Sequence, residues 1–188
     1  EHGGNCDIKN LCRGSRIYLP VYVKGGGIVV GDLHFSQGDG EITFCGAIEM
    51  SGWVDMHVDL IKGGCNKYGI GQAMFQPGPV DPNYSDYLVF EGISVEDDGT
   101  QRYLDVTLAY KQACMNAVNY LKKFGYSGEQ AYTILSCAPV EGHVSSVVDI
   151  PNACVAVQIP TAIFDFDIRP NAKGPSRQVK TSDLAFET

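Results

Sequence analysis

The chain has 188 residues, of which 44% are hydrophobic and 19% are charged, so it is long enough to bury one sizeable core. Its formal net charge is -8 and no basic patch stands out, which makes nucleic acid and anionic membrane surfaces poor partners. No apolar run is long enough for a membrane span, and no signal-peptide pattern opens the chain. Seven scattered cysteines without a CxxC pair indicate free thiols in a reducing compartment.

The first half predicts strands, because it is rich in β-branched and aromatic residues. The predicted strands cover residues 16–23, 28–35, 41–48, 53–61 and 87–95. Segment 53–61 alternates apolar and polar residues, which is typical of a strand with one solvated face. His57 shares that polar face with Asp55 and Asp59, which favours a solvated row over a metal site. Residues 63–86 are rich in glycine and proline and predict a long irregular excursion.

The second half predicts two helices. Apolar residues recur with helical spacing over residues 105–124, and Gly125 provides a stop signal. Ser127 is the expected N-cap of a second helix, which runs from Gly128 to about Cys137.

Strands are expected again at 144–148 and 153–159. Residues 171–188 form a polar tail in this interpretation. A strand-rich half followed by helices and further strands predicts an α+β fold.

The densest cluster of polar side chains lies in residues 31–41. On a strand, Asp32 and His34 are two residues apart and share one face, and a glycine-rich turn would return Asp39 and Glu41 to the same end. An imidazole with several carboxylates suits Zn²⁺ or a similar divalent ion, which polarises an acyl carbonyl and activates a bound water. The alternative interpretation is a polar hairpin whose turn is the Asp-Gly pair.

The first residues of the chain offer a second candidate motif. His2 is a candidate metal ligand or base, and Asn5 is a candidate donor to an oxyanion. The alternative is a terminal segment without a function.

Several stretches together resemble one known family. They are residues 1–10, 31–41, 44–49, 87–94, 122–126, 148–152 and 164–167. The sequence resembles the acetamidase/formamidase family, and most closely its formamidase branch, from Glu1 to about Arg169. The resemblance implies a β-rich layered α+β fold with two helices in the second half. It also implies an oligomeric hydrolase that converts formamide, a small neutral amide, to formate and ammonia with a divalent metal, zinc in particular.

The resemblance also implies roles for individual residues. The metal ligands would be His2, Asp32, His34 and Asp39. Glu41 would be the general base, with Glu49 as second choice. Asn5 and Gln37 would donate hydrogen bonds to the developing oxyanion.

Polypeptides of this family are longer than the present chain, so the resemblance implies that residues 1–170 form the C-terminal half of a family domain. The N-terminal half of the same polypeptide would then be a partner, and a homo-oligomer is expected. Two alternatives stay open, namely an acetamidase acting on slightly longer amides and a catalytically incomplete assembly fragment. Cytoplasmic localisation is the default expectation.

Overall fold

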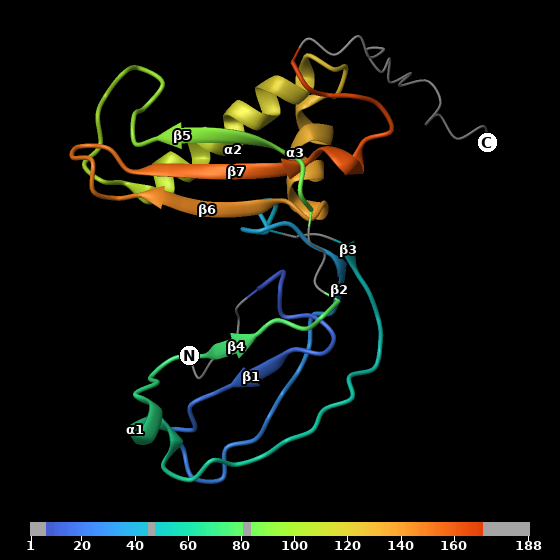
Figure 1. Ribbon diagram of the computed structural model, residues 1–188, viewed down its shortest axis with the longest axis vertical. Helices are drawn as coiled ribbons and strands as arrows, with labels where there is room; N and C mark the ends of the chain where they lie inside the picture. Colours follow the sequence, from blue (N-terminus) through green and yellow to red (C-terminus); the bar gives the residue numbers. More distant parts are fainter. Residues whose placement is uncertain (1–6, 45–47, 81–83, 171–188) are drawn as a thin grey trace. The chain divides into compact units, whose positions relative to one another are not determined.

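The computed structural model describes residues 7–44, 48–80 and 84–170 (Figure 1). The chain divides into two compact units. The first unit comprises residues 1–36 and 48–83, and the second comprises residues 37–47 and 84–188.

The first unit contains two small antiparallel pairs of strands and a short helix. Strand β1 (Arg16–Tyr18) pairs with β4 (Met74–Gln76), and β2 (His34–Ser36) pairs with β3 (Ile48–Glu49). Helix α1 covers Gly64–Tyr68. The rest of the described part of this unit is irregular or turned backbone.

The strand predictions for the first half are mostly wrong in extent. Segment 16–23 contains only the three-residue strand β1, segment 28–35 contains only the first two residues of β2, and segment 53–61 contains no strand. Residues 41–44 of the next predicted strand are irregular, turn or bend backbone, and β4 lies inside the excursion predicted to be irregular. The physical reason is that a strand needs a neighbour for its N–H and C=O groups, and these segments meet few described neighbours.

The second unit is built on one antiparallel sheet. Its strands are β5 (Tyr87–Ile93), β6 (Glu141–Ser146) and β7 (Cys154–Pro160), in the order β5-β7-β6. Helices α2 (Val106–Lys122) and α3 (Gly128–Cys137) lie on one face of this sheet (Figure 1). A short 3₁₀ helix, η1 (Thr161–Ile163), follows β7. This arrangement of helices on a sheet confirms the α+β prediction.

Local signals placed both helices correctly. Asp105 caps α2, and its carboxylate accepts a hydrogen bond from the Leu108 N–H at 2.9 Å. Ser127 caps α3 through a capping box with Gln130. The predicted strands 87–95, 144–148 and 153–159 correspond to β5, β6 and β7, but β6 begins at Glu141, three residues before the predicted start.

The core of the second unit lies between its helices and its sheet. A stripe of α2 is completely buried, at Ala109, Ala113, Ala117 and Leu121. It packs with α3 and with apolar side chains of β5 and β7 around Phe90, Val157 and Ile159. The helix lies so close to β5 that a Cβ atom added to Gly92 would be 2.2 Å from the Ala109 carbonyl oxygen. Small residues therefore set the distance between the helix and the sheet.

Two further findings concern the predicted class of protein. No helix within the described ranges is long and apolar enough to cross a membrane. The cysteines that the structure describes form no disulfide bond; they are Cys12, Cys65, Cys114, Cys137 and Cys154.

Candidate metal centre and active-site residues

The pairing of β2 with β3 brings a histidine and a carboxylate together in the first unit. His34 and Glu49 are directly opposite each other in the antiparallel register, so their side chains share one face. The Met50 N–H also donates to the Leu33 carbonyl oxygen at 2.8 Å, which extends the pairing by one step. One ligand atom each of Asp32, His34 and Glu49 lie within 4.8 Å of one another.

Asp32 lies on irregular backbone that precedes β2 and is not part of the strand. Its φ is 56°, in the left-handed region that aspartate tolerates better than most residues. Its Oδ2 lies 3.1 Å from the Nε2 of His34. The His34 side chain is only 8% exposed, whereas that of Asp32 is 54% exposed. The two residues thus lie together as the spacing suggests, but by a different backbone conformation.

The buried His34 ring has no hydrogen bond that satisfies its nitrogens. Nδ1 and Nε2 both lack a hydrogen-bond partner among the described residues. The Asp32 oxygen is at ion-pair distance from Nε2 but not in the direction that a hydrogen bond requires. An unsatisfied buried polar atom costs about 1–3 kcal/mol and therefore needs an explanation. Imidazole nitrogen and carboxylate oxygen are zinc ligands, so a bound divalent ion fits this donor set.

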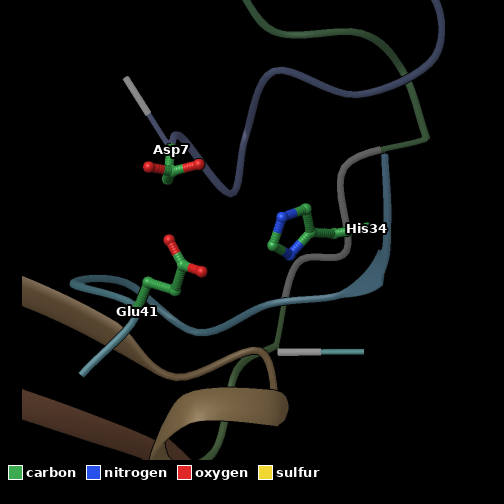
Figure 2. Close-up of side chains that lie close together, drawn as sticks. All are labelled: Asp7, His34 and Glu41. Atoms are coloured by element: carbon green, nitrogen blue, oxygen red, sulfur yellow. The ribbon is translucent and has the colours of Figure 1, made fainter. Parts of the chain in front are cut away.

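Asp7 adds another carboxylate on the same unit. A carboxylate oxygen of Asp7 lies within 4.8 Å of a His34 ring nitrogen. Figure 2 shows these two side chains; Glu41, also drawn there, belongs to the second unit. Sequence reasoning missed Asp7 as a site residue, because no spacing connects it with residues 31–41. Its position within the family-like stretch 1–10 was the available signal.

An open recess lies beside the carboxylates of this cluster. Its volume is about 430 Å³, and its lining includes Asp32 and Glu49 together with Leu33, Met50 and Ser51. It is therefore large enough for a small polar ligand and water.

In the second unit, Asp39 is held by the backbone of β6 and its flank. Its N–H donates to the Val140 carbonyl oxygen at 3.0 Å, and its Oδ2 accepts from the Gly142 N–H at 2.9 Å. The Tyr110 hydroxyl donates to the Asp39 carbonyl oxygen at 2.8 Å. Burial, with a smaller contribution from Cys114, raises the pKa of Tyr110 well above its ordinary value, which keeps the hydroxyl a donor. These contacts make Asp39 an anchor for residues 37–41.

Gln37 is a buried side chain with an unused donor. Its Nε2 is buried and has no hydrogen-bond partner among the described residues. The next residue fixes its position, because the Gly38 N–H donates to the Ser136 carbonyl oxygen at 2.7 Å. A Cβ at Gly38 would lie 2.4 Å from the Leu135 carbonyl oxygen, so only glycine fits there. An amide donor held in this way is suited to bind a developing negative charge.

Glu41 has an unusual backbone conformation. Its φ is 39°, in the left-handed region that is strained for glutamate. Four non-glycine residues in the described part have positive φ, and two of them are the candidate site residues Asp32 and Glu41. Such strain typically costs about 1–3 kcal/mol and is concentrated at functional sites.

The remaining predicted site residues, His2 and Asn5, lie outside the described residues, and their roles stay predictions. The predicted solvation of His57 is confirmed, since its side chain is 90% exposed and its Nε2 lies 3.3 Å from the Asp59 carboxylate.

Together, the fold and the site are those of an α+β protein with a candidate centre of one histidine and several carboxylates. The family model described as Acetamidase/Formamidase family matches residues 1–166. The chain belongs to this family, as its resemblance to it implied.

Two curated relatives and one solved structure sharpen this assignment. The chain is 68% identical to a formamidase of Methylophilus methylotrophus over 187 residues, which are 99% of this chain and 46% of that protein. It is 60% identical to an acetamidase of Mycolicibacterium smegmatis over 144 residues, 76% of this chain and 36% of that protein.

The solved structure is a gamma lactamase from Delftia acidovorans, with 68% identity and a TM-score of 0.90. The match covers 95% of this chain and 44% of the lactamase chain. The present chain thus spans less than half the length of each of these two curated relatives.

Proposed function

We propose that the polypeptide containing this chain hydrolyses formamide to formate and ammonia. The observation that carries the proposal is the His34 ring, buried with both nitrogens unsatisfied and surrounded by carboxylates. The 68% identity to a formamidase supports formamide as the substrate. The 60% identity to an acetamidase supports slightly longer aliphatic amides as the alternative.

Asp32, His34 and Glu49 would hold a divalent ion, for which zinc is the first candidate, with Asp7 as a further carboxylate. When bound there, such an ion supplies Lewis-acid polarisation of a carbonyl oxygen and lowers the pKa of a water. His2 stays a proposed ligand on the resemblance alone. Asp39 is less suited to this role, because its carboxylate already accepts the Gly142 N–H.

Glu41 is the proposed general base, which takes a proton from the attacking water and transfers it to the amide nitrogen, which then leaves as ammonia when the C–N bond breaks. The strained backbone of Glu41 supports this role. Glu49 is better placed as a ligand than as a base, because it lies opposite His34. The buried amide of Gln37 would donate to the oxyanion, with Asn5 as a second donor.

The test compares His34→Ala with His57→Ala in the full-length polypeptide, by zinc content and by ammonia release from formamide. His57 is a matched control, because it also lies beside an aspartate but is exposed. His34→Ala should lose the metal and reduce kcat by at least about 100-fold, whereas His57→Ala should change neither. Glu41→Gln should keep the metal and reduce kcat by about 100- to 10,000-fold.

Unchanged turnover in both His34→Ala and Glu41→Gln would contradict the assignment. Faster turnover of acetamide than of formamide in the wild type would favour the acetamidase alternative. If the full-length protein contains no metal and hydrolyses neither amide, the result would favour the alternative of a catalytically incomplete assembly fragment.

The N-terminal half of the same polypeptide is the proposed partner, and the complete protein is proposed to be a cytoplasmic homo-oligomer. The lengths of the relatives support the first point. The described cysteines form no disulfide bond, which supports a reducing compartment, and the family resemblance supports the oligomer.

A further inference from the structure

An exposed apolar row runs along segment 53–61 of the first unit. The row consists of Val54, Met56, Val58 and Leu60, all of which are classed as exposed, with Leu60 at 70%. Trp53, at the start of the segment, is 97% exposed. Fully burying a side chain of this kind contributes about 1.5–3 kcal/mol, so an uncovered row is unfavourable.

The segment has the pattern of a strand but no strand partner. Apolar residues occupy the even positions from 54 to 60, and Asp55, His57 and Asp59 occupy the odd positions between them. The contact between His57 and Asp59, two residues apart, shows that these two side chains lie on the same side of the chain. No N–H group of residues 53–61 donates a backbone hydrogen bond to another described residue. Among the described residues, the apolar row is therefore left exposed and the N–H groups of the segment have no backbone acceptor.

The solved lactamase structure contains the fold of this chain as part of a longer polypeptide. The lactamase structure matches 95% of this chain with a TM-score of 0.90, yet more than half of the lactamase chain lies outside the match. The formamidase likewise has more than half of its length outside the match. Residues that this chain does not contain are thus available in the relatives to cover the row.

We propose that residues 53–61 form a β-strand in the complete polypeptide, paired with a strand from the part that lies outside the matched region. The exposed apolar row is then buried against that part, and Asp55, His57 and Asp59 stay in solvent. The proposal rests on the partner named in the proposed function and assigns the surface that binds it. A second copy of this chain is the other candidate occupant, and the test below distinguishes the two.

The test is hydrogen–deuterium exchange of residues 53–61, measured in the 188-residue chain and in the full-length polypeptide. Amides in a paired strand should exchange at least about 100-fold more slowly in the full-length polypeptide. Val58→Lys should reduce that protection by at least about tenfold, because a lysine would enter the buried row. His57→Lys, one residue away on the polar face, is the matched control and should retain it.

Equal exchange rates in the two wild-type proteins would overturn the proposal, whether or not Val58→Lys folds. Protection that rises with the concentration of the 188-residue chain would overturn it in favour of a second copy. If the wild-type full-length polypeptide protects residues 53–61 from exchange but does not hydrolyse formamide, the proposed function is contradicted. The assignment of this surface is then still supported.

Discussion

The two units of this chain use apolar residues in different ways. In the second unit, β5, β6 and β7 pair with one another, and two helices cover one face of their sheet. In the first unit, apolar residues at 28–30 and 53–61 remain exposed, and its strands have at most three residues. The difference shows that a strand-like pattern yields a strand only where the chain supplies a neighbour for it.

The candidate site residues follow the same division. Asp32, His34 and Glu49 belong to the first unit, where a short pairing of β2 with β3 places them. Gln37 and Asp39 belong to the second unit, where hydrogen bonds to α2, the end of α3 and β6 hold their segment. Of these two groups of candidate site residues, only Gln37 and Asp39 are therefore held directly by a well-packed core.

The largest expected effect comes from truncating a leucine in each unit of the 188-residue chain. Leu121 is completely buried in the core of the second unit, so Leu121→Ala should lower the free energy of unfolding by about 2–5 kcal/mol. Leu60→Ala should change it by less than about 0.5 kcal/mol, because Leu60 is exposed. Denaturant unfolding of both variants measures the difference, and equal losses would contradict the contrast between the units.

An intermediate effect is expected from adding one methyl group to a glycine. Gly92→Ala would place a Cβ 2.2 Å from backbone atoms of α2, so it should destabilise the chain by about 1–3 kcal/mol. Gly31→Ala in the first unit is the control, because no atom lies within 4 Å of its added Cβ. Thermal unfolding should separate the two variants. A stable Gly92→Ala variant would mean that α2 and β5 are less closely packed.

The smallest expected effect is electrostatic and lies on the surface of the second unit. Hydrogen bonds from the Arg169 side chain, and then from its backbone N–H, lower the pKa of Asp167 to about 2. Because the folded-state pKa is lowered, the contribution of this pair to stability is present above the ordinary pKa of 3.8 and is lost as the pH falls toward 2. Its size is small, since the pair is exposed.

Arg169→Ala should return the pKa of Asp167 toward 3.8, as measured by NMR titration of its carboxyl carbon. Asp98 is the internal control, because hydrogen bonds from Thr100 are the main cause of its lowered pKa. A pKa of Asp167 that stayed near 2 in the variant would show that other groups hold it.

Several features of the site could be predicted from the sequence in part. The spacing of Asp32 and His34 suggested their contact, although the left-handed backbone of Asp32 produces it. The opposition of His34 and Glu49 depends on the register of β2 and β3, which joins residues fifteen positions apart. The position of Asp7 depends on a tertiary contact that no local pattern encodes.

By itself, the sequence determined the family, the α+β class and both long helices. Helix caps such as Asp105 and Ser127 and the stripe that includes Ala113 act within a few residues, so local physics suffices. Only the tertiary structure decided which strand-like segments became strands. Segment 53–61 has as clear an alternation as any in the chain, yet its hydrogen bonds need a neighbour that no local pattern supplies.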